Sequence, residues 1–415
     1  MPQLYTKLYP YFIIAALTLF TTLLLWMPFI LKINNLYGID TKNTSFQTVL
    51  QHWDGPLYII PAKTLYNPKN EILAGAPLGL ETKYFAAHLP MYPLTIRAFA
   101  PLFGFPKATI ISTLIFSIML FWFFYYFVNT LKLSRNPLLL TSVFMFITPR
   151  FFVTRSVGSP EPMFVLFILM SIYFFVKKRY LFAGLLGGLA ITTKTPAGLL
   201  FIAYLGGILY DYIQNRKIDF RWLWLIIIPG SLLLVFVLYG IQYGDFWAYF
   251  KSGDNLHLLF PPFKVFNFQK NWVDTAWLEE ILFIFLLYGL TVIELLPFSG
   301  LNNKISSVIP NLFRNLKEIL GRVQNDIIGK ETMRTKRVFF YFSFVFFLSL
   351  ISVQHRDIAR YSIPLLPVAL ITFEKFFTSK KFLIVLIFLL PAIYLYAWNF
   401  MLFNIAPITD WAPFI

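Results

Sequence analysis

The chain has 415 residues, of which 58% are hydrophobic and 20% aromatic, and its 35 Lys and Arg against 19 Asp and Glu give a formal net charge of +16. Charged residues make up only 13% of the chain, about half of the ~25% found in soluble domains, which leaves too little polar surface to cover a water-soluble globule. This composition excludes a soluble enzyme, a disordered chain and a nucleic-acid-binding protein, and it predicts a polytopic membrane protein. Because the chain contains no cysteine, disulfides, thiolate metal sites and cysteine nucleophiles are excluded as well.

Eleven apolar segments are long enough for us to expect that they cross about 30 Å of hydrocarbon as helices. In chain order they cover residues 11–31, 108–131, 137–153, 162–176, 180–193, 196–210, 222–243, 277–298, 338–353, 361–377 and 382–404. No small-residue cleavage motif follows the first segment, so we expect no cleavable signal peptide. Pro229-Gly230 predicts a kink inside the seventh segment. The sequence therefore predicts an all-α polytopic protein with a single transmembrane domain over 1–415.

The distribution of cations between these segments predicts their orientation. Short loops rich in Lys and Arg, such as Lys177-Lys178-Arg179, are typical of the cytoplasmic side, so we read most cations as topology signals and expect the N-terminus inside and the C-terminus outside. The longest connecting stretches are then 32–107 and 244–276 outside and 299–337 inside. The first outer loop is expected to form interfacial helices without a core of its own. The inner loop is basic and amphipathic in places, at Leu312, Leu316, Ile319, Leu320 and Val323, which is typical of a segment lying on the membrane surface.

Unusual polar residues gather in the segments expected on the outer side. The first outer loop contains His52-Trp53-Asp54-Gly55-Pro56-Leu57-Tyr58 and, further on, His88-Leu89-Pro90-Met91-Tyr92-Pro93. Asp54 fits two interpretations, since an aspartate before an apolar run is either a helix N-cap or a group that transfers protons. The second acid of this loop, Asp40, is expected in a turn.

Three further polar clusters fall on the same side. Glu161, in Ser159-Pro160-Glu161-Pro162, is either a helix cap or a ligand, and Lys194, in a tight turn, either snorkels to lipid headgroups or binds substrate. The third cluster is Gln354-His355-Arg356-Asp357-Ile358-Ala359-Arg360-Tyr361. Its positive charge opposes the orientation rule, which leaves a structural knot of salt bridges or an anion-binding site. The four histidines are too scattered to predict a metal site, and Glu294, near an inner helix end, is expected to be packed or snorkelling.

These motifs resemble those of the GT-C superfamily of lipid-phosphate-sugar-dependent glycosyltransferases, and within it the PIG-V type of mannosyltransferase. The resemblance covers roughly residues 50–200 and 355–370. It is carried by Trp53-Asp54 followed by Tyr58 and Ala62, by His88-Leu89-Pro90-Met91-Tyr92-Pro93-Leu94, by Ser159-Pro160-Glu161-Pro162, by Gly184 to Ala190 with Thr193-Lys194, and by Arg360-Tyr361 with Pro364 and Pro367. Two departures are Lys194, where the family has Arg, and His88-Leu89, where it has a Phe pair.

The resemblance implies a GT-C-like fold and an enzyme that moves one hexose, mannose or another, from a polyprenyl-phosphate donor to a hydroxyl of a glycan or lipid acceptor. Asp54 in the catalytic loop 32–107 would be the general base, on the extracytoplasmic side and with inversion. The expected donor-phosphate ligands are Arg360, Arg356, His355 and Lys194, and the expected substrate-binding residues are Glu161, Trp53, Tyr58, His88 and Tyr92. No cofactor is required, although a divalent metal at Asp54 would be compatible with the superfamily. The enzyme would be a multi-pass protein of the plasma membrane in a prokaryote or of the endoplasmic reticulum in a eukaryote.

Three alternatives compete with this interpretation. A transporter or flippase of lipid-linked sugar predicts polar residues deep in several helices, where the sequence has few. A polysaccharide polymerase or ligase predicts a large outer loop with an Arg-rich pocket, whereas 244–276 is small. A scaffold without catalysis gives no reason for the density of charge at 354–361.

Overall fold

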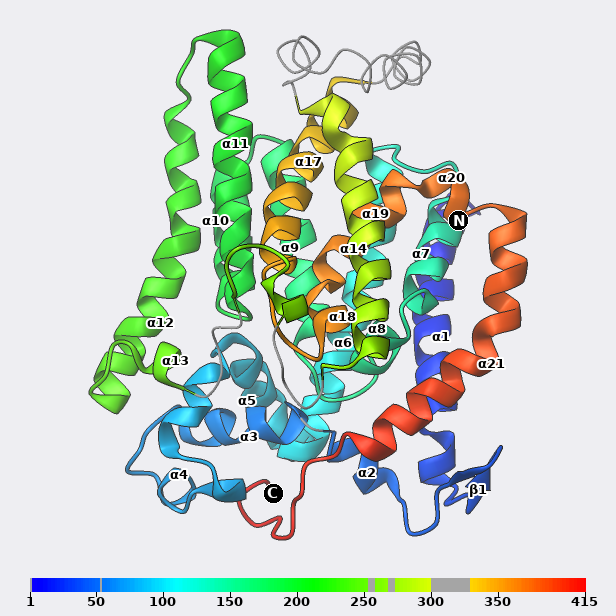
Figure 1. Cartoon of the computed structure of the whole chain (residues 1–415), viewed down its shortest axis with the longest axis vertical. Helices are drawn as coiled ribbons and strands as arrows, with labels where there is room; N and C mark the ends of the chain where they lie inside the picture. The colour runs from blue at the N-terminus through cyan, green and yellow to red at the C-terminus, as the bar shows by residue number, and fades with distance from the viewer. Residues whose placement is uncertain (1, 53, 253–257, 268–272, 300–328) are drawn as a thin grey trace.

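A computed structural model describes residues 2–52, 54–252, 258–267, 273–299 and 329–415 of the chain. The described residues are mostly helical, which confirms the all-α class (Figure 1). The strands they contain are Asn35–Leu36 (β1) and Ile39–Asp40 (β2), which pair antiparallel within the first long connecting segment, 32–107. The expected amphipathic stretch from Leu312 to Val323 lies outside the described residues.

Six helices in the described part of the chain are long and apolar enough to cross a membrane, so the expected count of eleven is not confirmed. They are α1 (Pro2–Ile30), α6 (Phe105–Thr130), α11 (Gly198–Asn215) with η3 (Thr195–Ala197), α12 (Ile227–Tyr243) with η4 (Phe220–Ile226), α14 (Thr275–Leu295) with η6 (Leu296–Phe298), and α21 (Lys380–Phe403). Shorter helices are α7 (Pro137–Phe146), α9 (Glu161–Val176) and α10 (Tyr180–Ile191), while α17 (Lys330–Leu350) begins with charged turns.

Prolines explain several of the differences from the expected spans. The segment 137–153 is divided at Thr148-Pro149 into α7 and α8 (Pro149–Thr154), because proline cannot donate the hydrogen bond that a continuous helix needs. The segment 361–377 is likewise divided into α18 (Ile358–Tyr361), η7 (Ile363–Leu365), α19 (Leu366–Thr372) and α20 (Glu374–Phe377). Pro229 lies in the first turn of α12, directly after η4, where a missing N–H is tolerated.

The helices expected in the first outer loop are present and lie together at one end of the molecule (Figure 1). They are α2 (Phe46–Leu50), α3 (Asp54–Thr64), α4 (Glu71–Ala74) and α5 (Met91–Phe103), with the 3-10 turns η1 (Pro77–Gly79) and η2 (Thr82–Ala87). The segment after α21 packs against them, since Ala406, Ile408 and Phe414 share a buried cluster with Leu57 and Ile60.

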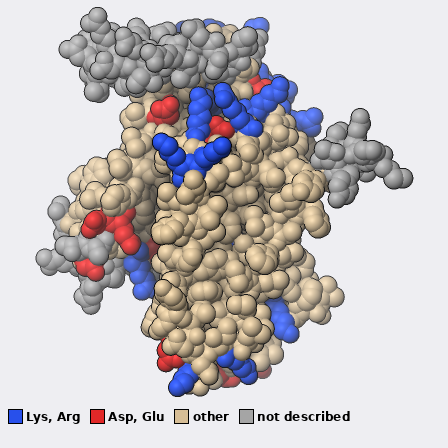
Figure 2. Space-filling model, turned by 90° about the vertical axis from the view of Figure 1, so that its right-hand side faces the viewer, with Lys and Arg blue, Asp and Glu red and all other residues tan. Residues whose placement is uncertain are grey.

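Helix α9 runs through the interior and begins beside the first-loop helices. It is apolar around its whole circumference, as a helix buried on all sides must be, and it contacts α6, α10 and α17. On the face drawn in Figure 2, Lys and Arg gather at the upper end, and few charged side chains interrupt the broad surface below them. The first-loop helices lie at the other end, so α9 delivers its first residue, Glu161, to the end opposite these cations.

Candidate active site

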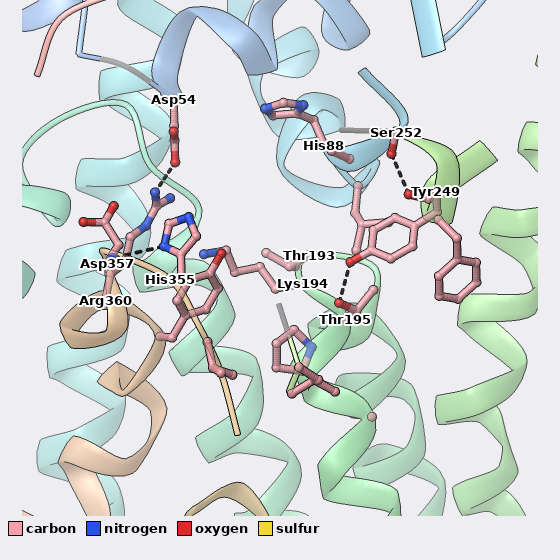
Figure 3. A pocket seen from close by; sticks show the side chains of 18 of the residues that line it. Asp54, His88, Thr193, Lys194, Thr195, Tyr249, Ser252, His355, Asp357 and Arg360 are labelled. Atoms are coloured by element: carbon pink, nitrogen blue, oxygen red, sulfur yellow. Dashed lines mark hydrogen bonds and ion pairs between the residues drawn. The ribbon is translucent and has the colours of Figure 1, made fainter. Parts of the chain in front are cut away.

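A cavity of about 630 Å³ lies where the first-loop helices meet the ends of the long helices. One part of its wall is polar and carries Asp54, His88, Lys194, Arg356 and Arg360 (Figure 3). Another part is apolar, and its residues come from α11, α12, the helix Ala248–Lys251 and the non-helical residues 258 and 353: Leu199, Leu232, Phe236, Phe250, Leu258 and Val353. The fold therefore brings together the acid Asp54 and the cations of 194 and 356–360, which are up to 306 positions apart in the chain.

Four charged side chains form one connected group at the polar wall, which we call the charged quartet: Asp54, Glu161, Lys194 and Arg360. Arg360 joins the two acids, since its Nη1 pairs with Asp54 and its Nε donates to Glu161. Lys194 donates to the same oxygen of Glu161, and the Ser159 hydroxyl donates to the other. The quartet is balanced in charge, and its side chains are at most 20% exposed.

The two acids of the quartet, Asp54 and Glu161, are each positioned by the start of a helix. Asp54 is the first residue of α3, and Glu161 is the first residue of α9, where prolines on both sides favour helix initiation. The helices approach closely because Gly55 packs directly on the backbone of Gly158, with room for no more than hydrogen between them. Both carboxylates bind cations, so the capping interpretations of the sequence do not account for their side chains.

Burial and charge act in opposite directions on Asp54. Burial, the largest single effect, opposes its ionisation, but Arg360 and Lys194 together with smaller contributions lower the pKa of the carboxyl below its ordinary value. Burial lowers the pKa of His88 to about 4 and that of the nearby His52 to about 4 as well, so both rings are neutral near pH 7. Burial also lowers the pKa of Lys194. The site thus holds an ionised carboxylate beside neutral imidazoles.

The segment 354–361 combines the two possibilities that the sequence left open, a knot of salt bridges and an anion-binding site. Asp357 pairs with Arg150, and Arg360 pairs with the acids of the quartet, so salt bridges account for most of its charge. The side chain of Arg356 is exposed, lines the cavity, and has no carboxylate partner among the described residues. Its positive charge is therefore the one that the neighbouring ion pairs do not compensate.

The expected substrate-binding aromatics divide into two groups. Tyr58 lines the cavity and makes edge-to-face contacts with His88 and Tyr92, at centroid distances of 4.7 and 5.0 Å. Tyr92 is fully buried, and its hydroxyl bonds to the Thr109 carbonyl at 2.9 Å and to the Thr113 hydroxyl at 2.7 Å. Tyr92 thus packs behind the wall, and its role in binding substrate stays a prediction. Trp53 lies outside the described residues.

Glu161 is 2% exposed and pairs with its cations, and its role in binding substrate stays a prediction. No sequence motif predicted several of the lining residues, among them Tyr249 of α13 (Ala248–Lys251), whose hydroxyl bonds to Thr195 at 2.8 Å. A tyrosine in an apolar loop carries no motif, so only the fold reveals it. Within the described residues, no group of three or more His, Asp and Glu is arranged to hold a metal ion.

Residues 87–239 match the family model described as dolichyl-phosphate-mannose-protein mannosyltransferase, a family of the GT-C superfamily. No curated protein and no solved structure matches the chain. The matched region contains His88, Glu161 and Lys194 but neither Asp54 nor Arg360. It confirms the superfamily resemblance, while the PIG-V type stays a prediction. Together with the apolar helices, the match shows that residues 87–239 are similar to a family of membrane glycosyltransferases of the GT-C superfamily.

Proposed function

We propose that the protein transfers one hexose, mannose in the first instance, from a polyprenyl-phosphate donor to an acceptor hydroxyl on the extracytoplasmic side, with Asp54 as general base. The observation that carries the proposal is the shared cavity, in which an ionised carboxylate lies beside several cations at one end of the helical bundle. A lipid-anchored phosphate is held at the level of the headgroups, so a cavity between the first-loop helices and the long helices is where such a donor would react. The printed name of the matched family supports both the donor class and mannose.

The reaction needs one base and a set of cations. The acceptor oxygen attacks the anomeric carbon as its proton passes to Asp54, and the bond from that carbon to the phosphate oxygen breaks. The electron pair leaves with the phosphate, so that polyprenyl phosphate is released and the anomeric configuration inverts. Because phosphate is a stable leaving anion, no second carboxylic acid is required, in contrast to glycoside hydrolysis.

The ion pairs of the site suggest which cation contacts the donor phosphate and which orients the base. Nε and Nη1 of Arg360 already bind carboxylates, so we assign Arg360 to orienting Asp54 and to meeting the phosphate with its remaining N–H groups. Arg356 and Lys194 line the cavity beside it, together with His355. We assign the first contact with the donor phosphate to Arg356, since its charge has no carboxylate partner among the described residues. Negative charge growing on the phosphate is then stabilised by fixed donors.

Tyr58 and His88 complete the proposal as the sugar-binding part of the wall. Both line the cavity beside Asp54, and the buried Nδ1 of His88 has no hydrogen-bond partner among the described residues. Neutral imidazole carries a donor and an acceptor, which suits sugar hydroxyls. No metal is needed in this scheme, because Arg356, Lys194 and Arg360 supply the positive charge.

The purified protein should be tested with a panel of polyprenyl-phosphate sugars and with glycan, lipid and hydroxyl-bearing peptide acceptors, with products identified by mass spectrometry. We expect release of polyprenyl phosphate together with an acceptor that has gained one hexose. A diphosphate-linked oligosaccharide in the same panel distinguishes a ligase, and transport of labelled donor across vesicles without product distinguishes a flippase. Failure to cleave every monophosphate donor would contradict the proposal.

A further inference from the structure

An ion pair between Arg150, outside the cavity, and Asp357, at its wall, holds the segment that carries the cations. Arg150 of α8 is 8% exposed, and its Nη2 pairs with the carboxylate of Asp357. The guanidinium also lies over the ring of Phe400 from α21, 3.7 Å from its centroid. Arg150 does not appear among the residues that line the cavity. It therefore joins α8, α21 and the segment 354–361 from behind the wall.

The backbone of Asp357 connects this ion pair to two residues that face the cavity. Its carbonyl accepts a hydrogen bond of 2.8 Å from the N–H of Arg360, which closes the turn that carries that guanidinium. Its N–H donates to Nδ1 of His355 at 3.0 Å (Figure 3). Because Nδ1 accepts this bond, the N–H of the ring is at Nε2, and such an N–H is a donor of the kind that a phosphate oxygen accepts.

The other side of the segment is held by α14. The indole Nε1 of Trp277 donates to the carbonyl of Arg356 at 3.2 Å. His355 also packs edge-to-face on Tyr361, at a centroid distance of 4.9 Å. The segment is thus held from two directions, while five of its residues line the cavity: His355, Arg356, Asp357, Arg360 and Tyr361.

We propose that Arg150 and Asp357 are a positioning pair, which sets the orientation of His355 and Arg360 toward the donor phosphate, with Arg150 acting from outside the cavity. The statement about the donor rests on the proposed function, whereas the statement about orientation rests on the contacts alone. A displacement of about 1 Å at a reacting group can cost about 100-fold in rate. Loss of the pair should therefore weaken donor binding in a protein that still folds.

The variants follow from the chemistry of the pair. Arg150→Met and Asp357→Asn each leave one partner behind, and an unpaired buried charge itself destabilises a protein. The double variant Arg150→Met/Asp357→Asn removes both charges and separates positioning from this destabilisation. The matched control is Lys177→Met, which breaks the 2.7 Å ion pair between Lys177 and Glu331 at the opposite end of the bundle.

Two measurements test the proposal. The chain contains no cysteine, so a spin label on Ala359→Cys reports on the segment alone, and its mobility should increase when the pair is removed but stay unchanged with Lys177→Met. The KM for polyprenyl-phosphate sugar should increase about 10- to 100-fold in the double variant, with the KM for the acceptor changed by less than about 3-fold. The charge-swapped variant Arg150→Asp/Asp357→Arg should recover part of the donor affinity.

The outcomes separate this inference from the proposed function. Unchanged label mobility in both single variants and in the double variant Arg150→Met/Asp357→Asn would overturn the inference. Equal increases in the donor and acceptor KM values would overturn it as well. If the wild-type protein cleaves no polyprenyl-phosphate sugar, the proposed function fails, and the label mobility still decides whether the pair fixes the segment.

Discussion

Gly55 and Gly158 approach each other closely, and this contact sets the separation between the starts of α3 and α9. We therefore expect that enlarging Gly158 lowers catalysis. A Cβ on Gly158 would lie 3.0 Å from the Cα of Gly55 and 3.2 Å from both Cβ and Oγ1 of Thr109. Ordinary contacts of this kind begin at 3.4 Å, so Gly158→Ala must push α3 or α6 outward by several tenths of an ångström. Overpacking of this kind costs about 1–3 kcal/mol of stability.

The same displacement should also lower activity. Gly55 adjoins Asp54, and Gly158 lies three residues before Glu161, so the displacement acts directly between the two acids that Arg360 joins. We expect kcat for sugar transfer to fall about 3- to 10-fold, because misplacement of about 1 Å costs about 100-fold and the displacement here is a few tenths of an ångström. The assay is product formation by the purified variant, with thermal unfolding in detergent measured on the same sample.

Gly230→Ala in α12 is the matched control, since a Cβ there meets nothing within 4 Å. It should leave kcat unchanged and raise stability slightly, because alanine favours a helix over glycine. Wild-type kcat in Gly158→Ala would refute the reasoning that the separation of the two helix starts controls the site.

Three further predictions concern the charges of the site. Arg356→Ala should lower kcat/KM for the donor about 100- to 1,000-fold, while the KM for the acceptor changes little. The two substrates are titrated separately, and equal effects on donor and acceptor would exclude a role of Arg356 in binding phosphate. Arg360 lowers the pKa of Asp54, and the base must be ionised to act. Activity should therefore persist as the pH falls to about 4, the ordinary pKa of an aspartate. The stabilisation from the Asp54–Arg360 pair should be lost only as the pH falls through the lowered pKa. Arg360→Gln should move the acid limb of the pH–rate profile upward, and an unmoved limb would contradict the assignment of that limb to Asp54. Chelation with EDTA should leave transfer unchanged, whereas loss of activity that Mn²⁺ or Mg²⁺ restores would show that a metal supplies part of the charge.

The membrane class and the location of the site could be predicted from the sequence because both depend on composition along the chain. Apolar segments must lie in lipid, and the polar residues between them must gather at the ends. The cluster at 354–361 conflicted with the orientation rule, and the structure shows why it is placed there: Arg360 is required by Asp54 and Glu161. A local conflict of this kind is typical of a functional site.

The number of spans and the roles of individual residues could not be predicted in the same way. Uniformly apolar sequence has no period, so it does not show where prolines such as Pro149 divide a segment into separate helices. Motif position did not show that Tyr92 faces inward, since that depends on Thr109 and Thr113 of another helix. The pairing of Arg150 with Asp357 joins residues 207 positions apart, and no local pattern encodes it.

The most direct test of the account is sugar transfer by Asp54→Asn. Asparagine keeps the size of the side chain but cannot take the proton of the acceptor, so transfer should fall by at least about 1,000-fold while binding of the polyprenyl-phosphate donor is retained. Asp40→Asn, in β2 of the same loop, is the control and should transfer sugar at the wild-type rate. Wild-type turnover by Asp54→Asn would contradict the central claim that this carboxylate is the base.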